Sequence, residues 1–451
     1  MITGTDLIAW GFKPGKWFKN ALEVANAARS AGASDDLIQD TLVNLQPVAP
    51  VEMTMRTNNI PFGMFIDAEN DLERSNVALV VNHMDALMRV PTIKAGAVMP
   101  DACPSGSQHG TIPVGGVVAC EDAIHPGFHS ADICCSVAMT VFKRHDNPKA
   151  ILDAVHSVTH FGPGGRTSSN SLAPRELMRK MESNIFLSGL ESYAANHFAT
   201  QGDGNHFAYV GHLKSTGNPV LVTHHGSRGL GAQVYKRGMA AAKKHTAIHA
   251  PRVPDHNSWI KADSETGRAY WEALQFCREW TKANHFAIHS LTARKIGNAI
   301  EQQIWNEHNF VFQKSDGLFY HGKGATPNWA GFSPDDSGMT LVPLNMAEPI
   351  LILSHLNNPG SLGFAPHGAG RNLGRKAFLR GHRPELPAGI DARFYCGKAD
   401  LSELPQAYKN AAAVRAQIKK YELGSVIDEI LPYDSIMAGD WEQDAPWRKK
   451  R

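Results

Sequence analysis

The fold class is decided by the segment Phe310-Val311-Phe312-Gln313-Lys314-Ser315-Asp316-Gly317-Leu318-Phe319-Tyr320. Its two short apolar runs flank Ser315-Asp316-Gly317, and an Asp-Gly pair between apolar runs is typical of a β-hairpin turn. The chain before it has the apolar spacing of helices in residues 171–200, 230–250 and 265–305. A hairpin next to long helical segments predicts an α+β fold.

Residues 51–140 alternate short apolar runs with glycine and proline, as in Ala95-Gly96-Ala97-Val98-Met99-Pro100 and Gly115-Gly116-Val117-Val118-Ala119. This pattern predicts strands and loops. We find no internal repeat, no low-complexity tract and no long linker after residue 50. We therefore expect residues 51–451 to form a single large mixed α/β domain.

The first fifty residues predict a small helical unit. A turn at residues 11–16 precedes helical spacing from Trp17 to Ala31, Gly32 would end that helix, and a second helix is expected from Asp35 to Leu45. The prolines in residues 46–50 cannot continue a helix, so we place a domain boundary near residue 50. The aromatic and basic side chains of this extension would suit either RNA docking or the packing of a helical pair; they are Trp10, Lys13, Lys16, Trp17 and Lys19.

The composition is that of an ordinary soluble globular protein, with 43% hydrophobic and 20% charged residues and a formal net charge of +2. That charge is too small to indicate a strongly basic nucleic-acid-binding protein. Because imidazoles ligate metals and glycines let backbone approach phosphate, the 22 His and 40 Gly point towards metal and phosphate. Six Cys in a chain of this length are typical of reduced thiols, and no signal segment or apolar stretch long enough for a membrane span is found. A cytoplasmic protein without a membrane segment is expected.

Several His, Cys and Asp residues lie in short motifs rich in glycine or other small residues, where metal ligands on tight loops often occur. No two of them form a local zinc pair, so spacing alone does not distinguish ligands from hydrogen-bonded structural residues. A thiol with several imidazoles and one carboxylate would suit zinc, cobalt or iron better than magnesium, and it does not select manganese. The candidate ligands are Asp132, Cys135, His206, His224 and His308.

A candidate nucleophile lies in Pro366-His367-Gly368-Ala369-Gly370-Arg371, with Arg375 close by. An imidazole nitrogen can attack a nucleoside triphosphate to give a phosphoramidate, and guanidinium groups can bind phosphate oxygens. The alternative reading is a glycine turn beside a structural histidine.

Six separate motifs resemble those of the RtcB family of RNA ligases in order and approximate spacing, within a resemblance that runs over residues 52–410. They are Asp132-Ile133-Cys134-Cys135, Gly204-Asn205-His206-Phe207, the run from His224 to Gly231, Glu307-His308-Asn309, Gly322-Lys323-Gly324-Ala325 and the run from His367 to Arg371. The resemblance implies an RtcB-type domain.

The resemblance also implies roles for these residues. Asp132, Cys135, His206, His224 and His308 would hold two Mn²⁺ ions, and His367 would carry GMP taken from GTP. Arg228 and Lys323 lie in matched motifs and are candidates to follow the RNA backbone. The nucleotide would be contacted by Asn205, His367, Gly368, Ala369, Gly370, Arg371, Tyr408 and a closing lysine, which we place at Lys449 although Lys450 also fits.

The implied activity is the joining of RNA 3′-phosphate or 2′,3′-cyclic phosphate ends to 5′-hydroxyl ends, in repair or splicing, with broken or cleaved RNA as the partner. Two alternatives stay open at this point. A metal-dependent phosphoesterase could use the same ligands on RNA ends without nucleotide transfer. An RNA-binding relative could retain the metal only for folding.

The chain departs from the family pattern around the nucleotide. Cys134 and Ser136 replace two glycines, Cys103 replaces a histidine, and Tyr209 stands where many members have a nucleotide-contacting acid. Pro343-Leu344-Asn345-Met346-Ala347 replaces a glycine-containing loop. These changes predict an altered nucleotide pocket and leave the preference between guanine and adenine open.

Lys314-Ser315-Asp316-Gly317 fits the Lys-x-Asp-Gly pattern of ligases that carry the nucleotide on lysine. We favour the hairpin turn, because the tetrapeptide falls between two apolar runs.

Overall fold

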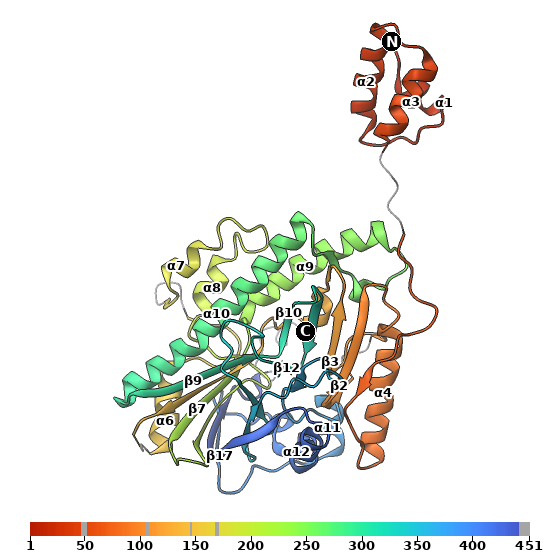
Figure 1. Ribbon diagram of the computed structural model, residues 1–451. Helices are drawn as coiled ribbons and strands as arrows, with labels where there is room; N and C mark the ends of the chain where they lie inside the picture. Colours follow the sequence, from red (N-terminus) through yellow and green to blue (C-terminus); the bar gives the residue numbers. More distant parts are fainter. Residues whose placement is uncertain (47–51, 105–107, 145–146, 167–170, 442–451) are drawn as a thin grey trace. The chain divides into compact units, whose positions relative to one another are not determined.

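The computed structural model describes residues 1–46, 52–104, 108–144, 147–166 and 171–441. The chain divides into two compact units, Met1–Met53 and Thr54–Arg451. The expected boundary near residue 50 lies outside the described residues. Figure 1 labels many of the elements of both units.

The N-terminal unit consists of three helices, α1 (Gly4–Ala9), α2 (Phe18–Ser30) and α3 (Asp35–Leu45). Ser34 caps α3, and its side chain accepts a hydrogen bond from the backbone of Leu37. In the expected turn before α2, Trp17 Nε1 donates to the Lys13 carbonyl at 3.1 Å. The ring of Trp17 lies edge-on to Phe12 and Phe18. The two predicted helices are confirmed, and Trp17 contributes to packing within the unit.

The larger unit contains a five-stranded sheet with the order β1-β2-β3-β11-β10. Its strands are β1 (Gly63–Met64), β2 (Ile93–Cys103), β3 (Val114–Cys120), β10 (Asn309–Gln313) and β11 (Phe319–Lys323). The predicted hairpin is present as β10 and β11, which pair antiparallel. Gly317 makes the turn possible, because its φ of +80° lies in the left-handed region that favours glycine.

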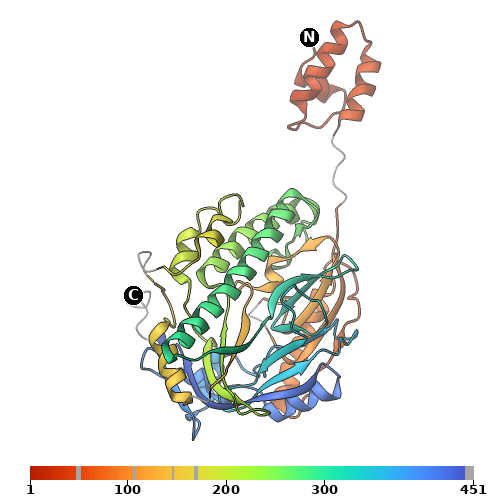
Figure 2. The same ribbon diagram turned by 60° about the vertical axis from the view of Figure 1, so that its left-hand side comes forward.

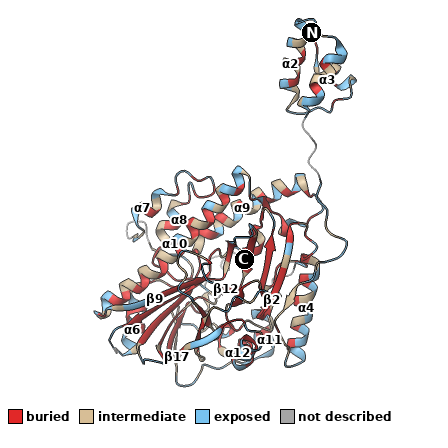
Figure 3. Ribbon diagram, in the orientation of Figure 1, coloured by how far each residue is buried: buried red, intermediate tan, exposed pale blue. Residues whose placement is uncertain are grey.

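A second sheet has eight strands, seven of them in the order β13-β14-β17-β6-β7-β5-β9, while β16 pairs with β17. The strands are buried along much of their length (Figure 3). They are β5 (Ser136–Phe142), β6 (Phe207–Leu213), β7 (Pro219–His225), β9 (Ile300–Glu307), β13 (Met339–Pro343), β14 (Ile350–Ser354), β16 (Asp391–Phe394) and β17 (Ser425–Met437).

Short strand pairs and helices complete the unit. The pairs are β4 (Ala123–Ile124) with β8 (Ile260–Lys261), and β12 (Ala325–Pro327) with β15 (Phe364–Pro366). The helices are α4 (Asp71–Leu87), α5 (Pro126–His129), α6 (Pro148–Val158), α7 (Arg175–Arg179), α8 (Glu191–His197), α9 (Arg228–His249), α10 (Glu265–Ile296), α11 (Arg375–Gly381) and α12 (Ala411–Lys420), with short 3-10 turns η2 (Asp255–Asn257), η3 (Leu401–Glu403) and η4 (Pro405–Ala407).

The helices are distributed over both sheets. The two long helices α9 and α10 pack against each other, and α10 also contacts β5 and β7 of the larger sheet (Figure 2). Helices α4 and α12 contact β2 of the smaller sheet. The fold is a mixed α+β domain, as predicted. Among the described residues, no helix combines the length and apolar character needed to cross a bilayer.

Three sequence predictions were wrong in detail. Residues 71–87 form a helix inside the region expected to hold strands and loops. Residues 300–305 belong to β9 instead of continuing the preceding helix, because Gly297 ends α10 in a left-handed conformation. The helical spacing of residues 171–200 is realised only as the short helices α7 and α8.

Candidate metal and nucleotide site

The candidate metal ligands meet because the ends of four strands of the eight-stranded sheet lie next to one another. Strand β5 is antiparallel to both β7 and β9, and β6 is antiparallel to β7. The start of β5 and the start of β6 therefore adjoin the ends of β7 and β9. These four positions carry Cys135, His206, His224 and His308.

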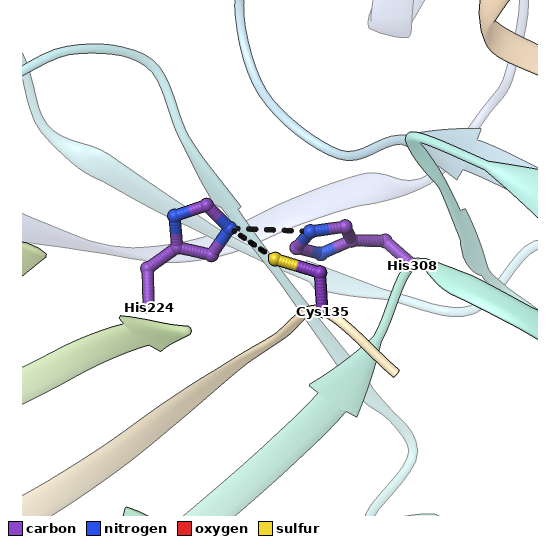
Figure 4. A group of neighbouring side chains, drawn as sticks. All are labelled: Cys135, His224 and His308. Carbon is purple, nitrogen blue, oxygen red and sulfur yellow. Dashed lines mark hydrogen bonds between the residues drawn. The ribbon is translucent and has the colours of Figure 1, made fainter. Parts of the chain in front are cut away.

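The side chains of Cys135, His224 and His308 point towards one another (Figure 4). Cys135 Sγ lies 3.2 Å from His224 Nε2, which lies 3.2 Å from His308 Nε2. A second group shares the same thiol, since His206 Nε2 lies 3.5 Å from Cys135 Sγ and 3.0 Å from Asp132 Oδ2. The structure thus brings all five predicted ligands together as two overlapping groups, each of which could hold a metal ion.

The protonation states of two imidazoles and the carboxylate fit metal binding, whereas burial raises the pKa of the Cys135 thiol well above its usual value, so this thiol would ligate a cation by losing its proton. His224 Nδ1 donates to the Asn205 carbonyl at 2.9 Å, which leaves the Nε2 lone pair directed at Cys135 and His308. Burial lowers the pKa of His224 to about 3 and holds the pKa of His308 well below its usual range. Loss of solvation alone would raise the pKa of Asp132, but its interactions with His206, Cys135 and His224 together outweigh this effect, and the pKa falls to about 2. Neutral imidazoles and a carboxylate are the forms that ligate a cation.

Two glycines make room for these ligands. A Cβ atom at Gly226 would lie 2.0 Å from Asp132 Oδ1, and one at Gly202 would lie 1.6 Å from His206 Nδ1. Any side chain at either position would displace a ligand. By contrast, Cys134 has a φ of +58°, so a residue with a Cβ occupies a conformation that favours glycine.

His367 borders the same cluster, since its ring centroid lies 4.9 Å from that of His308. The buried carboxylate of Asp101 accepts from the His367 backbone N–H at 3.0 Å and from the ring nitrogen Nδ1. This contact orients the ring and leaves Nε2 as the nitrogen with a free lone pair. Asp101 was missed by the sequence analysis, although its neighbour Cys103 was noted as a departure in the same motif.

A cavity of about 690 Å³ opens beside His367 and His224. Its lining includes the predicted nucleotide residues of the motif from His367 to Arg371, together with Asn205 and Tyr408. The predicted Lys449 lies outside the described residues. The cavity is large enough for a nucleotide.

The altered loop and Tyr209 also line this cavity. Leu344, Asn345 and Met346 contribute to one wall. Tyr209 is buried, and its hydroxyl donates to the Ile430 carbonyl at 3.0 Å. Because that hydroxyl is directed into the sheet, Tyr209 offers the cavity its apolar ring.

Glu403, in η3, was also missed by the sequence analysis. Its carboxylate accepts from Arg371, from Arg375 Nε at 2.6 Å and from the Tyr408 hydroxyl at 2.6 Å. The guanidinium of Arg371 lies 4.5 Å from the Tyr408 ring centroid. Only the proximity of Glu403 to Tyr408 in sequence could have drawn attention to it.

Three other basic residues have structural contacts. Lys314 Nζ donates to the Leu362 carbonyl at 2.6 Å and lies 4.0 Å from the Trp329 ring centroid. The turn reading of its tetrapeptide is confirmed by the hydrogen bond from the Gly317 backbone N–H to the Lys314 carbonyl at 3.0 Å and by the antiparallel pairing of β10 with β11. Arg228 donates to the carbonyls of Gly162 and Gly164, and Lys323 Nζ donates to the Ile112 carbonyl at 3.3 Å.

Comparison with known proteins identifies the family of this chain. Residues 164–437, more than half of the chain, match the family model described as tRNA-splicing ligase RtcB. A tRNA-splicing ligase RtcB from Aeropyrum pernix is 24% identical over 75% of this chain and 87% of its own length. The tRNA-splicing ligase RtcB of Thermococcus kodakarensis is 25% identical over 75% of this chain and 86% of its own length. The RNA-splicing ligase RtcB of Escherichia coli is 23% identical over 71% of this chain and 85% of its own length. The chain therefore belongs to the RtcB family.

Proposed function

We propose that this chain is a metal-dependent RNA ligase that joins RNA 3′-phosphate or 2′,3′-cyclic phosphate ends to 5′-hydroxyl ends, in RNA repair or splicing. The observation that carries the proposal is the position of His367 beside the ligand cluster: its ring centroid lies 4.9 Å from that of His308, and it lines the same cavity as His224. A nucleophile and metal ligands so close to one another suit transfer of a phosphoryl group.

His367 is the nucleophile in this proposal. With Nδ1 bonded to Asp101, its Nε2 lone pair attacks the α-phosphorus of GTP. A phosphorus–nitrogen bond forms, the bond to the β-phosphate oxygen breaks, and pyrophosphate leaves. The product is a phosphoramidate that holds GMP on His367.

Two further transfers complete the reaction. An oxygen of the RNA 3′-phosphate attacks the α-phosphorus, the phosphorus–nitrogen bond breaks, and His367 is released. The 5′-hydroxyl of the second RNA end then attacks the activated 3′-phosphorus, loses its proton and displaces GMP. A 2′,3′-cyclic phosphate is first opened by water.

The metal ligands are proposed to be Asp132, Cys135, His206, His224 and His308, which would hold two Mn²⁺ ions. Their fit rests on the shared thiol and on the lone pair of His224 Nε2, which points at the other ligands. When bound, such ions polarise phosphoryl oxygens and neutralise charge on a leaving pyrophosphate. A thiolate and imidazoles would also accept Zn²⁺, so the choice of Mn²⁺ draws on the family.

GTP is proposed to lie in the cavity, with contacts from Asn205, the backbone of residues 368–370, Arg371 and Tyr408. Gly370 has a φ of +71°, and a Cβ there would lie 1.9 Å from the Asp101 carbonyl oxygen, so the backbone could not follow this path with another residue. Arg371 lies over the ring of Tyr408, and the part of that ring that lines the cavity is the proposed contact to the base.

The proposal is tested by incubating the protein with Mn²⁺ and GTP labelled at the α-phosphate, and by measuring label that stays on the denatured protein. We expect labelling of the unchanged protein and none of His367→Ala. Lys314→Met is a matched control for the other candidate nucleotide carrier, and we expect it to be labelled normally. Parallel reactions with labelled ATP test the altered pocket.

The alternative reading, a phosphoesterase, gives a different pattern in the same experiment. It predicts metal-dependent hydrolysis of RNA 2′,3′-cyclic phosphate ends that persists in His367→Ala, with no nucleotide on the protein. That pattern would remove the ligase proposal.

A further inference from the structure

Glu403 is a buried carboxylate that no step of the proposed reaction uses. Its side chain is 0% exposed, although it lies in the wall of the cavity. Each of its oxygens is engaged, one by Arg375 Nε and the other by Arg371 and the Tyr408 hydroxyl. Three side chains that face the cavity thus converge on one anionic group.

The two arginines differ in how much of their hydrogen-bonding capacity is used. Arg371 donates to Glu403 and to the Ser402 carbonyl, and its side chain is only 14% exposed. Arg375 is 48% exposed and uses Nε for Glu403. Within the described part of the chain, no partner accepts from its two terminal nitrogens. Arg375 therefore presents a free guanidinium edge towards solvent.

The position of that edge relates it to the metal site. A Cβ atom built on Gly204 would lie 3.3 Å from Arg375 Nη2. Gly204 belongs to the loop that carries Asn205, whose carbonyl accepts from His224 Nδ1, and the candidate ligand His206. Arg375 therefore lies between the loop of the metal ligands and Glu403.

We propose that Glu403 is a positioning residue that holds Arg371 and Arg375 as a phosphate clamp for the triphosphate of the nucleotide. The phosphate clamp consists of these three residues. Two guanidinium groups repel each other and have long flexible side chains, so an empty pair would separate. A carboxylate between them offsets the repulsion and fixes the orientation of both guanidinium groups. The three residues together then carry a net charge of +1, which favours the binding of an anion.

The identity of the anion rests on the proposed function, because the clamp lines the cavity assigned to GTP. The binding of phosphate by the clamp does not depend on nucleotide transfer. Inorganic pyrophosphate therefore serves as a probe that separates the two ideas.

The test measures pyrophosphate binding by titration calorimetry in the absence of metal, with the full chain and the variants Glu403→Gln, Glu403→Asp and Arg375→Lys. Glu403→Gln keeps the shape but loses the charge, and we expect binding weaker by about tenfold or more. Glu403→Asp keeps the charge and should recover part of the affinity. Arg375→Lys replaces a guanidinium, which can donate two parallel hydrogen bonds to a phosphate, with an ammonium that cannot. With Glu403 intact, we expect this variant to bind pyrophosphate about tenfold more weakly.

The double variant Glu403→Gln with Arg375→Lys shows whether Glu403 acts through Arg375. A positioning role predicts that Arg375→Lys costs little once Glu403 is lost, so the two effects are far from additive. Additive effects, or Glu403→Gln that folds and binds pyrophosphate normally, would overturn the clamp. If Glu403→Gln fails to fold because Arg371 is then buried without its partner, Arg375→Lys alone decides, and unchanged binding would again overturn it.

The outcomes for the two proposals are distinct. A protein that binds pyrophosphate through the clamp but takes no label from GTP contradicts the ligase and supports the clamp. A protein that is labelled normally, with pyrophosphate binding insensitive to Glu403 and Arg375, supports the ligase and contradicts the clamp.

Discussion

Among single residues, Asp101 has the most direct influence on His367. Its carboxylate accepts from both the backbone N–H and Nδ1 of His367, so it fixes the ring orientation and the tautomer together. The sequence motif Pro100-Asp101-Ala102-Cys103 made the loss of a histidine at Cys103 conspicuous, while the retained aspartate was overlooked. A role that depends on a partner 266 residues away cannot be recognised from local sequence.

The substitution Asp101→Asn tests this contact. The amide can donate to Nδ1, which moves the ring proton to Nε2 and removes the attacking lone pair. We expect the rate of His367 labelling to fall by roughly 10²- to 10⁴-fold. The measurement is the initial rate of label incorporation from GTP, with the thermal midpoint of unfolding as the control for folding. Labelling of a folded Asp101→Asn at the normal rate would contradict the role.

Between elements, a buried polar network joins α10 to the sheet that carries the metal ligands. Thr223 Oγ1, on β7, lies 2.6 Å from His285 Nδ1 and 2.7 Å from His289 Nε2. Ser136 Oγ, on β5, lies 3.0 Å from His285 Nε2. Neighbouring residues Cys135 and His224 point to the other face of the same strands, because side chains alternate along a strand. The network therefore fixes α10 on the face opposite the site.

Replacing Thr223 with Val tests how much this network stabilises the fold. The change keeps the shape and leaves two buried imidazole nitrogens without a partner, so we expect the free energy of unfolding to fall by about 1–3 kcal/mol. Thr292→Val is the matched control, because the Thr292 hydroxyl is equally buried in α10 but donates to the Ile288 carbonyl of its own helix. Urea unfolding of both variants gives the comparison. An equal loss of unfolding free energy in the two variants would show that the contacts of the Thr223 hydroxyl with His285 and His289 add no stability.

The elements that sequence predicted well are those whose apolar pattern matches their burial. The hairpin of β10 and β11 was predictable because Asp316 and Gly317 separate two buried runs. Helix α4 was not, because its buried face begins with the polar residues Glu73 and Asn76 before Val80, Met84 and Leu87. Strand β9 was taken for helix because Glu301, Gln302 and Gln303 are exposed on an edge strand, where polar helix-forming residues are tolerated.

The five candidate ligands were predicted as a set because their motifs resemble those of the RtcB family, whereas spacing alone did not distinguish them from structural residues. Their convergence follows from the antiparallel order of β9, β5, β7 and β6, which no local pattern reveals. The same limit applies to Glu403, whose significance comes from Arg371 and Arg375, more than 25 residues away. Side chains that act through long-range contacts need the structure.

For the larger unit as a whole, buried histidines relate stability to pH. His125 and His289 have their pKa lowered to about 3, and His129 to about 4, in each case through burial. Because these pKa values lie far below 7, the three imidazoles are neutral in the folded state at neutral pH, and each is hydrogen-bonded inside the protein. The ligands of the candidate metal site are separate from this group.

We expect the free energy of unfolding to fall as the pH drops below about 6.5. Unfolding exposes these imidazoles, which then take up protons near pH 6.5, whereas the folded protein resists protonation until about pH 3 to 4. Each histidine therefore contributes stability that is present above pH 6.5 and is lost at about 1.4 kcal/mol per pH unit on acidification. Urea unfolding between pH 7.5 and 5 measures the slope. His289→Gln should reduce it by one histidine's share, whereas His156→Gln, at an exposed position, should leave it unchanged. A slope that His289→Gln does not alter would show that this histidine is protonated equally in both states.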